Sequence, residues 1–302
     1  MDVHVVGIGE VLWDLLLTGP QLGGAPANFA YHAHALGAQT HVITSVGNDD
    51  YGREIIRRFQ AMGLSDAAVQ VDETAPTGTA TVTLSGDGLA HFTIQENVAW
   101  DHIALTSEAA AVVSQADAIC FGSLAQRSEL SRHTIQRLIA ATPANALRVF
   151  DINLRQQFYS RDVIERSLQL ANVLKLNDDE LPSLAAMFNL TRSTENQMEQ
   201  LARAFSLRVV ALTRGANGSL LYRKDEEEVW WSECLSRPVQ VVDTVGAGDS
   251  FTAALVLGLL RKMDLDEINM LADEVARYVC SQAGATPPMP AEFARKFSMA
   301  PE

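Results

Sequence analysis

A short glycine-rich motif near the C-terminal end of the chain is the first candidate for chemistry. It reads Gly246-Ala247-Gly248-Asp249 and stands directly before an apolar run long enough for a helix. The first turn of a helix has unpaired N–H groups and partial positive charge, so Asp249 could serve only as a cap. The same turn is a ready anion site, in which backbone amides hold a phosphoryl group and the carboxylate takes a proton from an attacking hydroxyl.

The segments on both sides of this motif favour the catalytic interpretation. The preceding run PVQVVDT, residues 238–244, is rich in strand-forming residues, and the following run SFTAALVLGLL, residues 250–260, predicts a long helix. The small residues of the motif carry no side chain that would block the backbone amides, so an anion can approach them closely.

A second glycine cluster lies near the N-terminus and leads into another predicted helix. It reads LGGAPAN, residues 22–28. Gly23 and Gly24 would let a ligand approach the backbone, and Asn28 offers both a donor and an acceptor to a hydroxyl. A plain turn followed by a helix start explains the same residues equally well.

The sequence lacks two familiar nucleotide-binding motifs. No G-x-x-x-x-G-K-[ST] motif is present, because no lysine follows a glycine. The run GIGEVL, residues 7–12, begins like G-x-G-x-x-G but lacks the third glycine, so a dinucleotide site is not expected there.

Short apolar runs recur along the chain, separated by stretches of helix length. They are residues 3–9, 41–47, 118–122, 148–153, 172–177 and 208–213. This alternation predicts an α/β fold with a largely parallel sheet and helices on both faces, and we read residues 1–302 as a single domain. Polar and glycine residues follow each run, at the edge where open α/β sheets bind ligands, although loops are polar in any case.

Two β-rich segments do not fit this alternation. They are residues 10–18 and 77–97, and a Gly-Asp-Gly turn at 86–88 would split the second into a hairpin. We expect them to form a small separate sheet that covers the site as a lid, the alternative being a flank that merely packs on the core. Apolar residues on its outer face would suit a homodimer formed through the lid. They include Leu16, Val82 and Leu84.

Composition excludes several functions. The net charge of −14 and the lack of a basic cluster argue against nucleic acid and anionic membranes as partners. The first residues have no basic region of a signal peptide, and three scattered cysteines fit a reducing cytoplasm, so a cytoplasmic protein is expected. The acidic run at 224–228 is interpreted as a solvated hairpin tip, and the histidines at 32 and 34 fall on different helix faces rather than in a metal site.

Four spaced motifs together resemble the ribokinase-type (PfkB) carbohydrate kinases over nearly the whole chain. The stretches 23–52 and 243–255 resemble the two signature regions of that family, in the right order and separation. Between them, NDDE at 177–180 resembles N-x-x-E, and TRGANG at 213–218 resembles the T-x-G nucleotide loop. The resemblance implies an ATP-dependent sugar kinase with a ribokinase-like α/β core and a lid.

The resemblance also implies roles for individual residues. Asp249 is similar to the catalytic base, and the backbone from Gly246 through Ala247 to Gly248 is similar to the anion hole. The sugar would contact Asp14, Gly23, Gly24, Asn28 and Asp249. The nucleotide would contact Asn177, Thr213, Gly215, Gly218 and Gly248.

The same resemblance also implies that two kinds of metal ion bind. Glu180, with Asn177, would organise Mg²⁺ through water. A monovalent cation such as K⁺ would lie near Asp243, Val245 and Gly284, although Pro288 stands where some members have a serine.

Several stretches look most like the bacterial fructokinase branch. They are GEVLWD (9–14), QENVAWD (95–101), GSLA (122–125) and DINLR (151–155). Asp14 can accept hydrogen bonds from two sugar hydroxyls and would repel an anionic sugar acid. The expected reaction is therefore fructose to fructose 6-phosphate. Arg155 keeps 2-keto-3-deoxygluconate as the alternative, unless it only forms a salt bridge at the strand edge.

A protein of another class remains possible on this fold, namely a module that senses sugar or nucleotide without turnover. Such a module would be expected to lose Asp249 or Glu180, and both are present.

Overall fold

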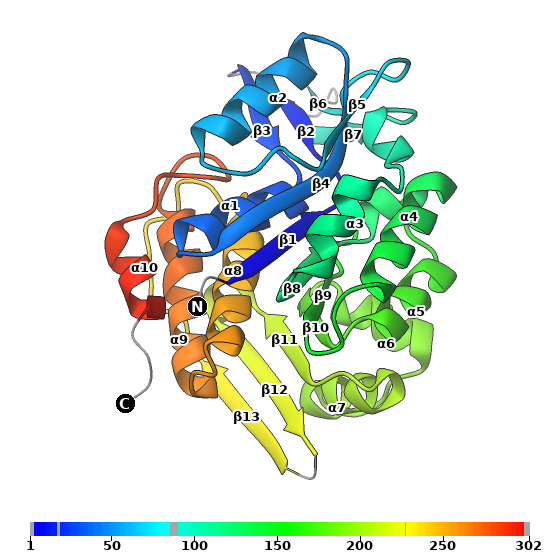
Figure 1. The fold of residues 1–302 in the computed structure, drawn as a ribbon. Helices are drawn as coiled ribbons and strands as arrows, with labels where there is room; N and C mark the ends of the chain where they lie inside the picture. Colours follow the sequence, from blue (N-terminus) through cyan, green and yellow to red (C-terminus); the bar gives the residue numbers. More distant parts are fainter. Residues whose placement is uncertain (1–2, 17–18, 85–89, 227, 299–302) are drawn as a thin grey trace.

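A large sheet forms the centre of the structure, a computed structural model that describes residues 3–16, 19–84, 90–226 and 228–298. Within these residues the sheet has nine strands in the order β13-β12-β11-β10-β9-β8-β1-β4-β5 (Figure 1). Neighbouring strands from β5 to β11 run parallel, and β12 and β13 add an antiparallel hairpin at one edge. The strands are β1 (His4–Ile8), β4 (Gln39–Gly47), β5 (Val69–Asp72), β8 (Ala118–Phe121), β9 (Leu147–Asp151), β10 (Val173–Asn177), β11 (Val209–Thr213), β12 (Ser219–Asp225) and β13 (Glu228–Cys234).

Helices cover both faces of this sheet (Figure 1). One face carries α1 (Ala25–Ala35), α8 (Ala247–Leu260), α9 (Leu265–Cys280) and α10 (Ala291–Ser298). The other carries α3 (Ser107–Ser114), α4 (Glu129–Ala140), α5 (Arg161–Leu170), α6 (Leu181–Phe188) and α7 (Thr194–Phe205). The predicted fold class, a largely parallel sheet with helices on both faces, is confirmed.

The two-sided burial of the strands follows from their apolar sequence. Successive side chains of a strand point to opposite faces, so Val5 packs with α1 and α8 while Val6 packs with α3 and α4. The same division separates Val149 from Phe150 in β9. A run with no polar position can therefore lie only in the middle of the molecule.

The position of helix α8 explains why its sequence is apolar on every face. Residues 250–258 are all buried, because the helix lies between the sheet, α1 and α9. Gly258 allows α9 to approach, since a Cβ there would lie 2.6 Å from a side-chain carbon of Ile268. Burying each Leu or Val of this run contributes roughly 1.5–3 kcal/mol, so packing on three sides fixes the position of the helix.

A second, smaller sheet has the order β3-β2-β6-β7. It comprises β2 (Leu12–Leu16), β3 (Gly19–Gly23), β6 (Thr79–Leu84) and β7 (Ala90–Ile94), and it packs partly on α2 (Asp50–Ala61). The predicted separate sheet from the two irregular segments is therefore confirmed, with β2 and β6 paired in parallel. Strand β3 was not expected, because GPQLG contains two glycines and a proline, which are rare inside strands.

Part of the lid prediction falls outside the described residues. These residues do not include the turn at 86–88 or residues 17–18, and the side chains of Val82 and Leu84 are not described either. The lid function and the homodimer through its outer face stay predictions.

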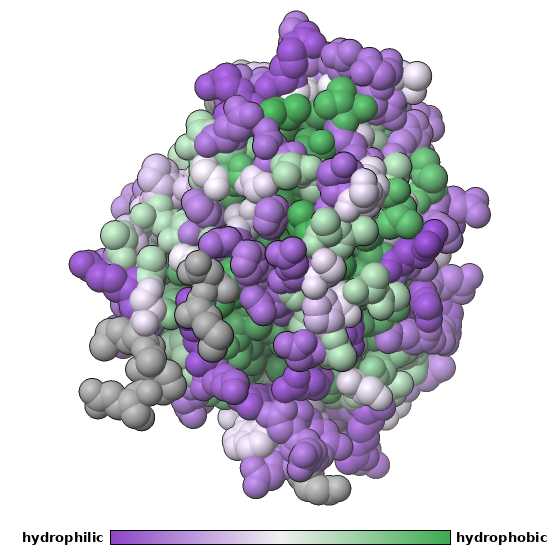
Figure 2. All heavy atoms as spheres, viewed as in Figure 1, coloured by the Kyte–Doolittle hydropathy of each residue, from purple (hydrophilic) through white to green (hydrophobic). Residues whose placement is uncertain are grey.

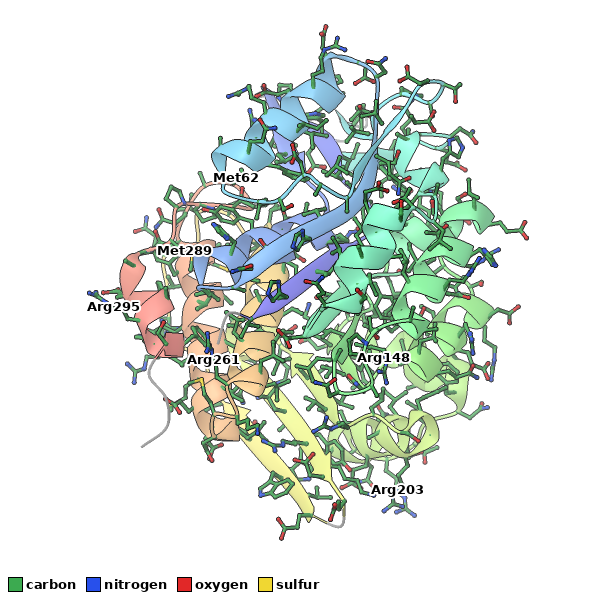
Figure 3. The ribbon with its side chains drawn as sticks, in the orientation of Figure 1. Met62, Arg148, Arg203, Arg261, Met289 and Arg295 are labelled. Atoms are coloured by element: carbon green, nitrogen blue, oxygen red, sulfur yellow. The ribbon has the colours of Figure 1, made fainter. Side chains whose placement is uncertain are left out.

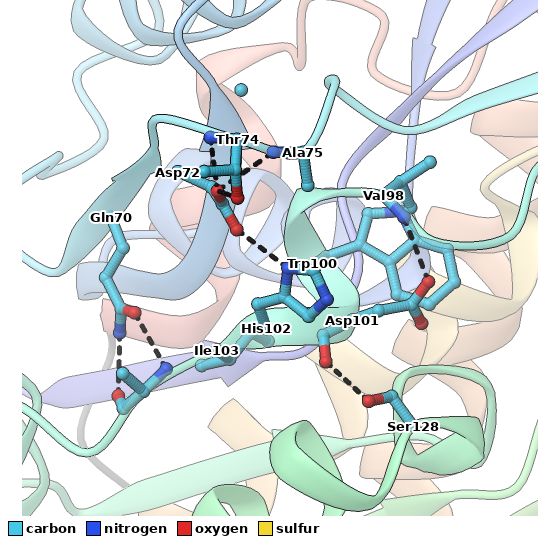
Figure 4. A network of polar contacts seen from close by, with 12 residues as sticks. Gln70, Asp72, Thr74, Ala75, Val98, Trp100, Asp101, His102, Ile103 and Ser128 are labelled. Carbon is cyan, nitrogen blue, oxygen red and sulfur yellow. Dashed lines mark hydrogen bonds and ion pairs between the residues drawn. The ribbon is translucent and has the colours of Figure 1, made fainter.

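A polar network fixes the segment that follows the small sheet (Figure 4). After β7 the chain enters the 3₁₀ helix η1 (Ala99–His102), where His102 contacts Asp72 at the end of β5 through Nδ1 at 2.8 Å. Asp72 also accepts hydrogen bonds from the backbone of Thr74 and Ala75. Although burial opposes its charge, these bonds hold the pKa of Asp72 well below its usual range. One end of the small sheet is thus anchored to the main sheet.

The run before the glycine motif, although rich in strand-forming residues, is not a strand. Residues 238–244 pair with no strand in the described chain, and the backbone N–H groups of Val242 and Asp243 donate instead to the Cys280 carbonyl. Branched apolar residues favour a strand only where a neighbouring strand is free to pair with them. The hairpin expected around 224–228 is confirmed by the pairing of Asp225 with Glu228.

Hydrophilic and apolar side chains are mixed on the face of the molecule that Figure 2 shows. The labelled Arg148, Arg203, Arg261 and Arg295 come from separate parts of the fold and lie apart in Figure 3. Among the described residues, no helix combines the length and apolarity needed to cross a membrane.

Candidate active site

The polar strand exits meet at one edge of the main sheet. Parallel strands β1, β8, β9, β10 and β11 end side by side, so the residues that follow them share this edge. The chain runs from β1 to β4 on one side and later places β8 on the other side of β1, which makes a topological switch point. Such a point is where open α/β sheets form a ligand crevice.

The two glycine clusters come together at this edge. Asn28 Nδ2, in the first turn of α1, donates a hydrogen bond of 2.8 Å to Asp249 Oδ2 in the first turn of α8. The two residues are 221 positions apart in the chain. The contact between α1 and α8 therefore joins the residue predicted to bind a hydroxyl to the residue predicted to deprotonate it.

The surroundings of Asp249 suit a base near neutral pH. Burial, and then the charge of Asp151, raise its pKa to about 6, while the bond from Asn28 and the charges of Lys175 and Arg155 work in the opposite direction. A carboxylate with this pKa is ionised at pH 7 and can still hold a proton briefly.

The anion-hole segment is shaped by backbone geometry. Gly246 is the N-cap of α8 with φ of 81°, and a Cβ there would overlap the carbonyl of Ala285. Only glycine meets both conditions without strain. Gly246 provides no side-chain cap, so the amide of Gly248 lies at a positively polarised helix end, whereas the amide of Ala247 donates to the Thr244 carbonyl at 3.3 Å.

The predicted sugar contacts also lie together. Asp14 is on β2, paired through β3 with the segment that enters α1, and a Cβ on Gly23 would lie 2.5 Å from Asp14 Oδ2. Gly24 is the N-cap of α1. Burial raises the pKa of Asp14, and the charge of Arg155 lowers it.

Glu10 was not considered as a site residue from the sequence, whereas Arg155 was considered only as a partner for an acidic sugar. Glu10, directly after β1, is buried and its Oε2 has no hydrogen-bond partner. Burial raises its pKa to about 7, with Arg155 lowering it and Asp249 raising it further. Arg155 thus acts electrostatically on Glu10, Asp14 and Asp249. For Glu10, the signal in the sequence was an acid at the end of a wholly apolar run.

The predicted nucleotide residues occupy neighbouring strand ends. Asn177 and Thr213 are partners in the parallel register of β10 and β11. Gly215 lies in the 3₁₀ turn η3 (Gly215–Asn217), and Gly218 closes that turn through a 2.7 Å bond from Arg214 N to Gly218 O. The loop between β11 and β12 is therefore compact and presents backbone beside Asn177.

Glu180 ties two strand exits together. Its Oε1 accepts from Leu154 N at 2.9 Å and its Oε2 from Asn177 N at 2.8 Å, while Asn177 Oδ1 accepts from Glu180 N at 2.8 Å. Burial raises the pKa of Glu180 and Lys175 lowers it. In the described chain no group of three or more His, Cys, Asp or Glu side chains could enclose a metal. The side-chain oxygens of Glu180 and Asn177 would therefore suit a Mg²⁺ ion whose ligands are mostly water and phosphate oxygens.

The three residues predicted around a monovalent cation are also brought together. Asp243 Oδ1 accepts from Val245 N at 3.0 Å, and Oδ2 accepts from Gly284 N at 3.1 Å. Asp243 thus holds the strand-like run before α8 against the loop after α9.

A hollow of about 210 Å³ lies between the small sheet and that loop. Pro20 and Gln21 of β3 line one side and Gly284 lines the other. A larger hollow of about 390 Å³, around Arg127 and Phe158, contains none of the residues predicted for the site.

Comparison with known proteins identifies the family of the chain. The model of the pfkB family carbohydrate kinases matches residues 19–292. A sugar kinase of Pyrococcus horikoshii is 30% identical over 300 residues, which cover 93% of this chain and 91% of that protein. A fructokinase of Klebsiella pneumoniae is 28% identical over 287 residues and 91% of each chain. A solved complex of an uncharacterized Pyrococcus horikoshii sugar kinase with ATP has a TM-score of 0.81 at 28% identity, over 97% of this chain and 99% of that chain.

The chain therefore belongs to the pfkB family of carbohydrate kinases, as its motifs predicted. Enzymes of this class transfer a phosphoryl group to a sugar hydroxyl, and the crevice described above is where this chain collects the residue types that such a transfer needs.

Proposed function

We propose that this protein is an ATP-dependent fructokinase that converts fructose to fructose 6-phosphate, with Asp249 as the general base. The observation that carries the proposal is the hydrogen bond between Asn28 and Asp249, at the N-terminus of α8. It joins a hydroxyl-binding group, a base and an anion site at one point. The fructokinases among the similar proteins support fructose as the acceptor.

The nucleotide would lie along the exits of β10 and β11. Asn177, Thr213, Gly215 and Gly218 line this side, with Gly248 at the phosphate end. Exposed Val239, Val241, Val242 and Val245 offer apolar surface for the base. An ATP-bound structure of a similar sugar kinase supports ATP as donor. Bound Mg²⁺ would neutralise phosphate charge, and Glu180 would hold it through water.

The residues of the chain would divide the reaction as follows. Asp14, Gly23, Gly24 and Asn28 orient the sugar so that one hydroxyl faces Asp249, which takes its proton. The hydroxyl oxygen then forms a bond to the γ-phosphorus, the bond from that phosphorus to the bridging oxygen breaks, and ADP leaves with the electron pair. The backbone from Gly246 to Gly248 faces the charge on the phosphoryl oxygens during transfer.

A second candidate is 2-keto-3-deoxygluconate kinase. Arg155 favours it, because this exposed cation acts on Asp14, Glu10 and Asp249 and could pair with the carboxylate of a sugar acid. Asp14 opposes it through like-charge repulsion. A pocket dominated by the Asp14 carboxylate would favour fructose, and one dominated by the Arg155 guanidinium would favour 2-keto-3-deoxygluconate.

A panel of acceptors tests the proposal. Fructose, 2-keto-3-deoxygluconate, glucose and ribose are incubated with ATP and Mg²⁺, and the phosphate ester is detected by mass spectrometry and ³¹P NMR. Fructose should give the highest kcat/KM. A higher value for 2-keto-3-deoxygluconate would replace it with the second candidate. Nucleotide binding with no ester from any sugar would instead indicate a sensing module.

We also propose that Asp243, Val245 and Gly284 support a monovalent cation beside the anion hole. Their convergence through two backbone hydrogen bonds to Asp243 supports this role. Activity measured in K⁺ should exceed activity in tetramethylammonium at equal ionic strength, and equal rates would contradict the proposal.

A further inference from the structure

A buried ammonium group lies directly behind the anion-hole segment. Lys175 is the central residue of β10, in the run VLKLN, where a charged side chain interrupts an otherwise apolar strand. Its Nζ is 3.2 Å from Asp151 Oδ1, and both side chains are only 7% exposed. Removing two charges from water costs several kcal/mol per ion, so a buried pair is weak evidence for stability alone.

This pair reaches the first turn of α8. A Cβ on Gly248 would lie 2.9 Å from Lys175 Nζ, so the ammonium occupies the space that a side chain at that position would need. Thr252 Oγ1, also fully buried, donates to Asp151 Oδ2 at 2.8 Å and lies 3.0 Å from the Gly248 carbonyl. A lysine of β10, an aspartate of β9 and a threonine of α8 are therefore locked together under Gly248.

The ammonium is also the positive centre among the acids of the site. Lys175 interacts electrostatically with Asp151, Glu180 and Asp249, and together these acids keep its pKa raised despite the opposing effect of burial. The Lys175 ammonium thus interacts with the predicted base Asp249, with Glu180, which is predicted to organise Mg²⁺, and with its ion-pair partner Asp151. The Lys175 ammonium is buried, so water screens it weakly. It can therefore stabilise negative charge that develops on a phosphoryl group at the N-terminus of α8.

We propose that Lys175 is a positioning residue for phosphoryl transfer: its ammonium, held by Asp151 and Thr252, fixes the backbone at Gly248 and supplies positive charge behind the anion hole. This inference rests on the proposed function, because it assumes that phosphate binds at Gly246–Gly248. It adds a side chain to an anion site that otherwise consists of backbone. It also explains why position 248 has no side chain.

The charges around Asp249 determine whether each substitution raises or lowers its pKa. Lys175 from β10 and Arg155 from the β9 exit favour its ionised form, as does the bond from Asn28 of α1. Asp151 from β9 and Glu10 from the β1 exit disfavour it, and Cys120 of β8 is a buried neutral thiol. Removing Lys175 should therefore raise the pKa of Asp249, and removing the charge of Asp151 should lower it.

Three variants test the proposal: Lys175→Met, Asp151→Asn and the double variant. In Lys175→Met we expect kcat to fall about 10- to 100-fold, and the acid limb of kcat/KM to move about one pH unit higher. Asp151→Asn should move the limb lower. The double variant, which leaves neither charge buried alone, should return the limb towards the wild-type position. Lys224→Met, at an exposed lysine of β12, is the matched control.

A second measurement separates this inference from the proposed function. The titration of the Asp249 carboxylate, followed by ¹³C NMR, reports the same shifts without turnover. An active wild type with unshifted limbs and unchanged kcat in the folded variants would show that the pair is only structural. An inactive wild type whose Asp249 titration still moves as described would refute the kinase assignment and keep the electrostatic link. If Lys175→Met fails to fold, the double variant decides, because unchanged kcat there overturns the proposal.

Discussion

The proposed phosphate end and the proposed sugar end of the site are built in different ways. At the phosphate end, Gly246 to Asp249 are consecutive residues in one turn of α8, and the anion would meet mainly backbone. At the sugar end the groups come from separate elements, with Asp14 on β2, Asn28 on α1 and Glu10 after β1. A backbone site can be specified by a few adjacent small residues, whereas a side-chain site depends on how distant segments pack. The first arrangement therefore depends on local sequence and the second on the tertiary fold.

The largest effect is expected where the two ends meet. Asp249→Asn should reduce kcat by about 10²–10⁴, because the amide cannot take the proton, while ATP binding changes little. Steady-state kinetics and nucleotide titration measure both quantities, with the exposed Asp162→Asn as control. In the wild type, kcat/KM should rise with pH through about 6, where Asp249 ionises. Turnover within a few-fold of wild type would return Asp249 to the role of a helix cap.

The second prediction concerns the cost of charge at the sugar end. The pKa of Glu10 is raised from 4.5 to about 7, so the folded chain binds this proton more tightly than the unfolded chain. The associated stability is complete below about pH 4.5 and is lost as pH rises through 7, by at most about 3 kcal/mol. Glu10→Gln removes this loss, so its free energy of unfolding relative to wild type should increase from pH 5 to pH 8.

Urea denaturation across that pH range measures the difference. The exposed Glu129→Gln provides a control that should show no such trend. If the difference in free energy of unfolding between wild type and Glu10→Gln does not change with pH, Glu10 is paired or hydrated. In that case ionisation of Glu10 does not destabilise the folded protein.

The smallest effect should be confined to the sugar end. Asp14→Asn keeps the volume next to Gly23 but weakens acceptance from sugar hydroxyls, so the KM for fructose should rise about 10-fold while the KM for ATP stays within two-fold. The same change removes the repulsion of a sugar acid and should improve 2-keto-3-deoxygluconate relative to fructose. Equal changes in the KM values of sugar and ATP would break the distinction between the two ends.

The sequence predicted the features that depend on local pattern. The six buried strand runs and the helix after Asp249 followed from apolar periodicity, and the glycine motifs followed from their small residues. The run at 238–244 has strand-forming residues but forms no strand, because strand formation needs a partner that no local pattern reveals. Strand β3 was missed because pairing with β2 overrides the poor strand propensity of its glycines and proline.

The charged residues of the site were less predictable than its backbone. Asn28 was identified from its place after the glycine cluster and Asp14 through family motifs, but the proposed importance of Glu10 and Lys175 arises only from burial next to other charges. Lys175 looks unremarkable in VLKLN until β9 brings Asp151 to it and α8 brings Gly248. Electrostatic environment is a property of the fold, so it cannot be read from neighbours in the chain.

The long-range contacts of α1 also determine when the protein can fold during synthesis. Tyr31 donates to the Pro287 carbonyl and His32 contacts the Ala285 carbonyl, across 256 and 253 positions. Strand β1 leaves the ribosome before α8 and α9, yet those two helices complete the core that holds Val5 and Phe29. The nascent chain must therefore carry exposed apolar surface until α8 and α9 have been translated. A chain stopped before α8 would leave Val5 and Phe29 without the helices that cover them.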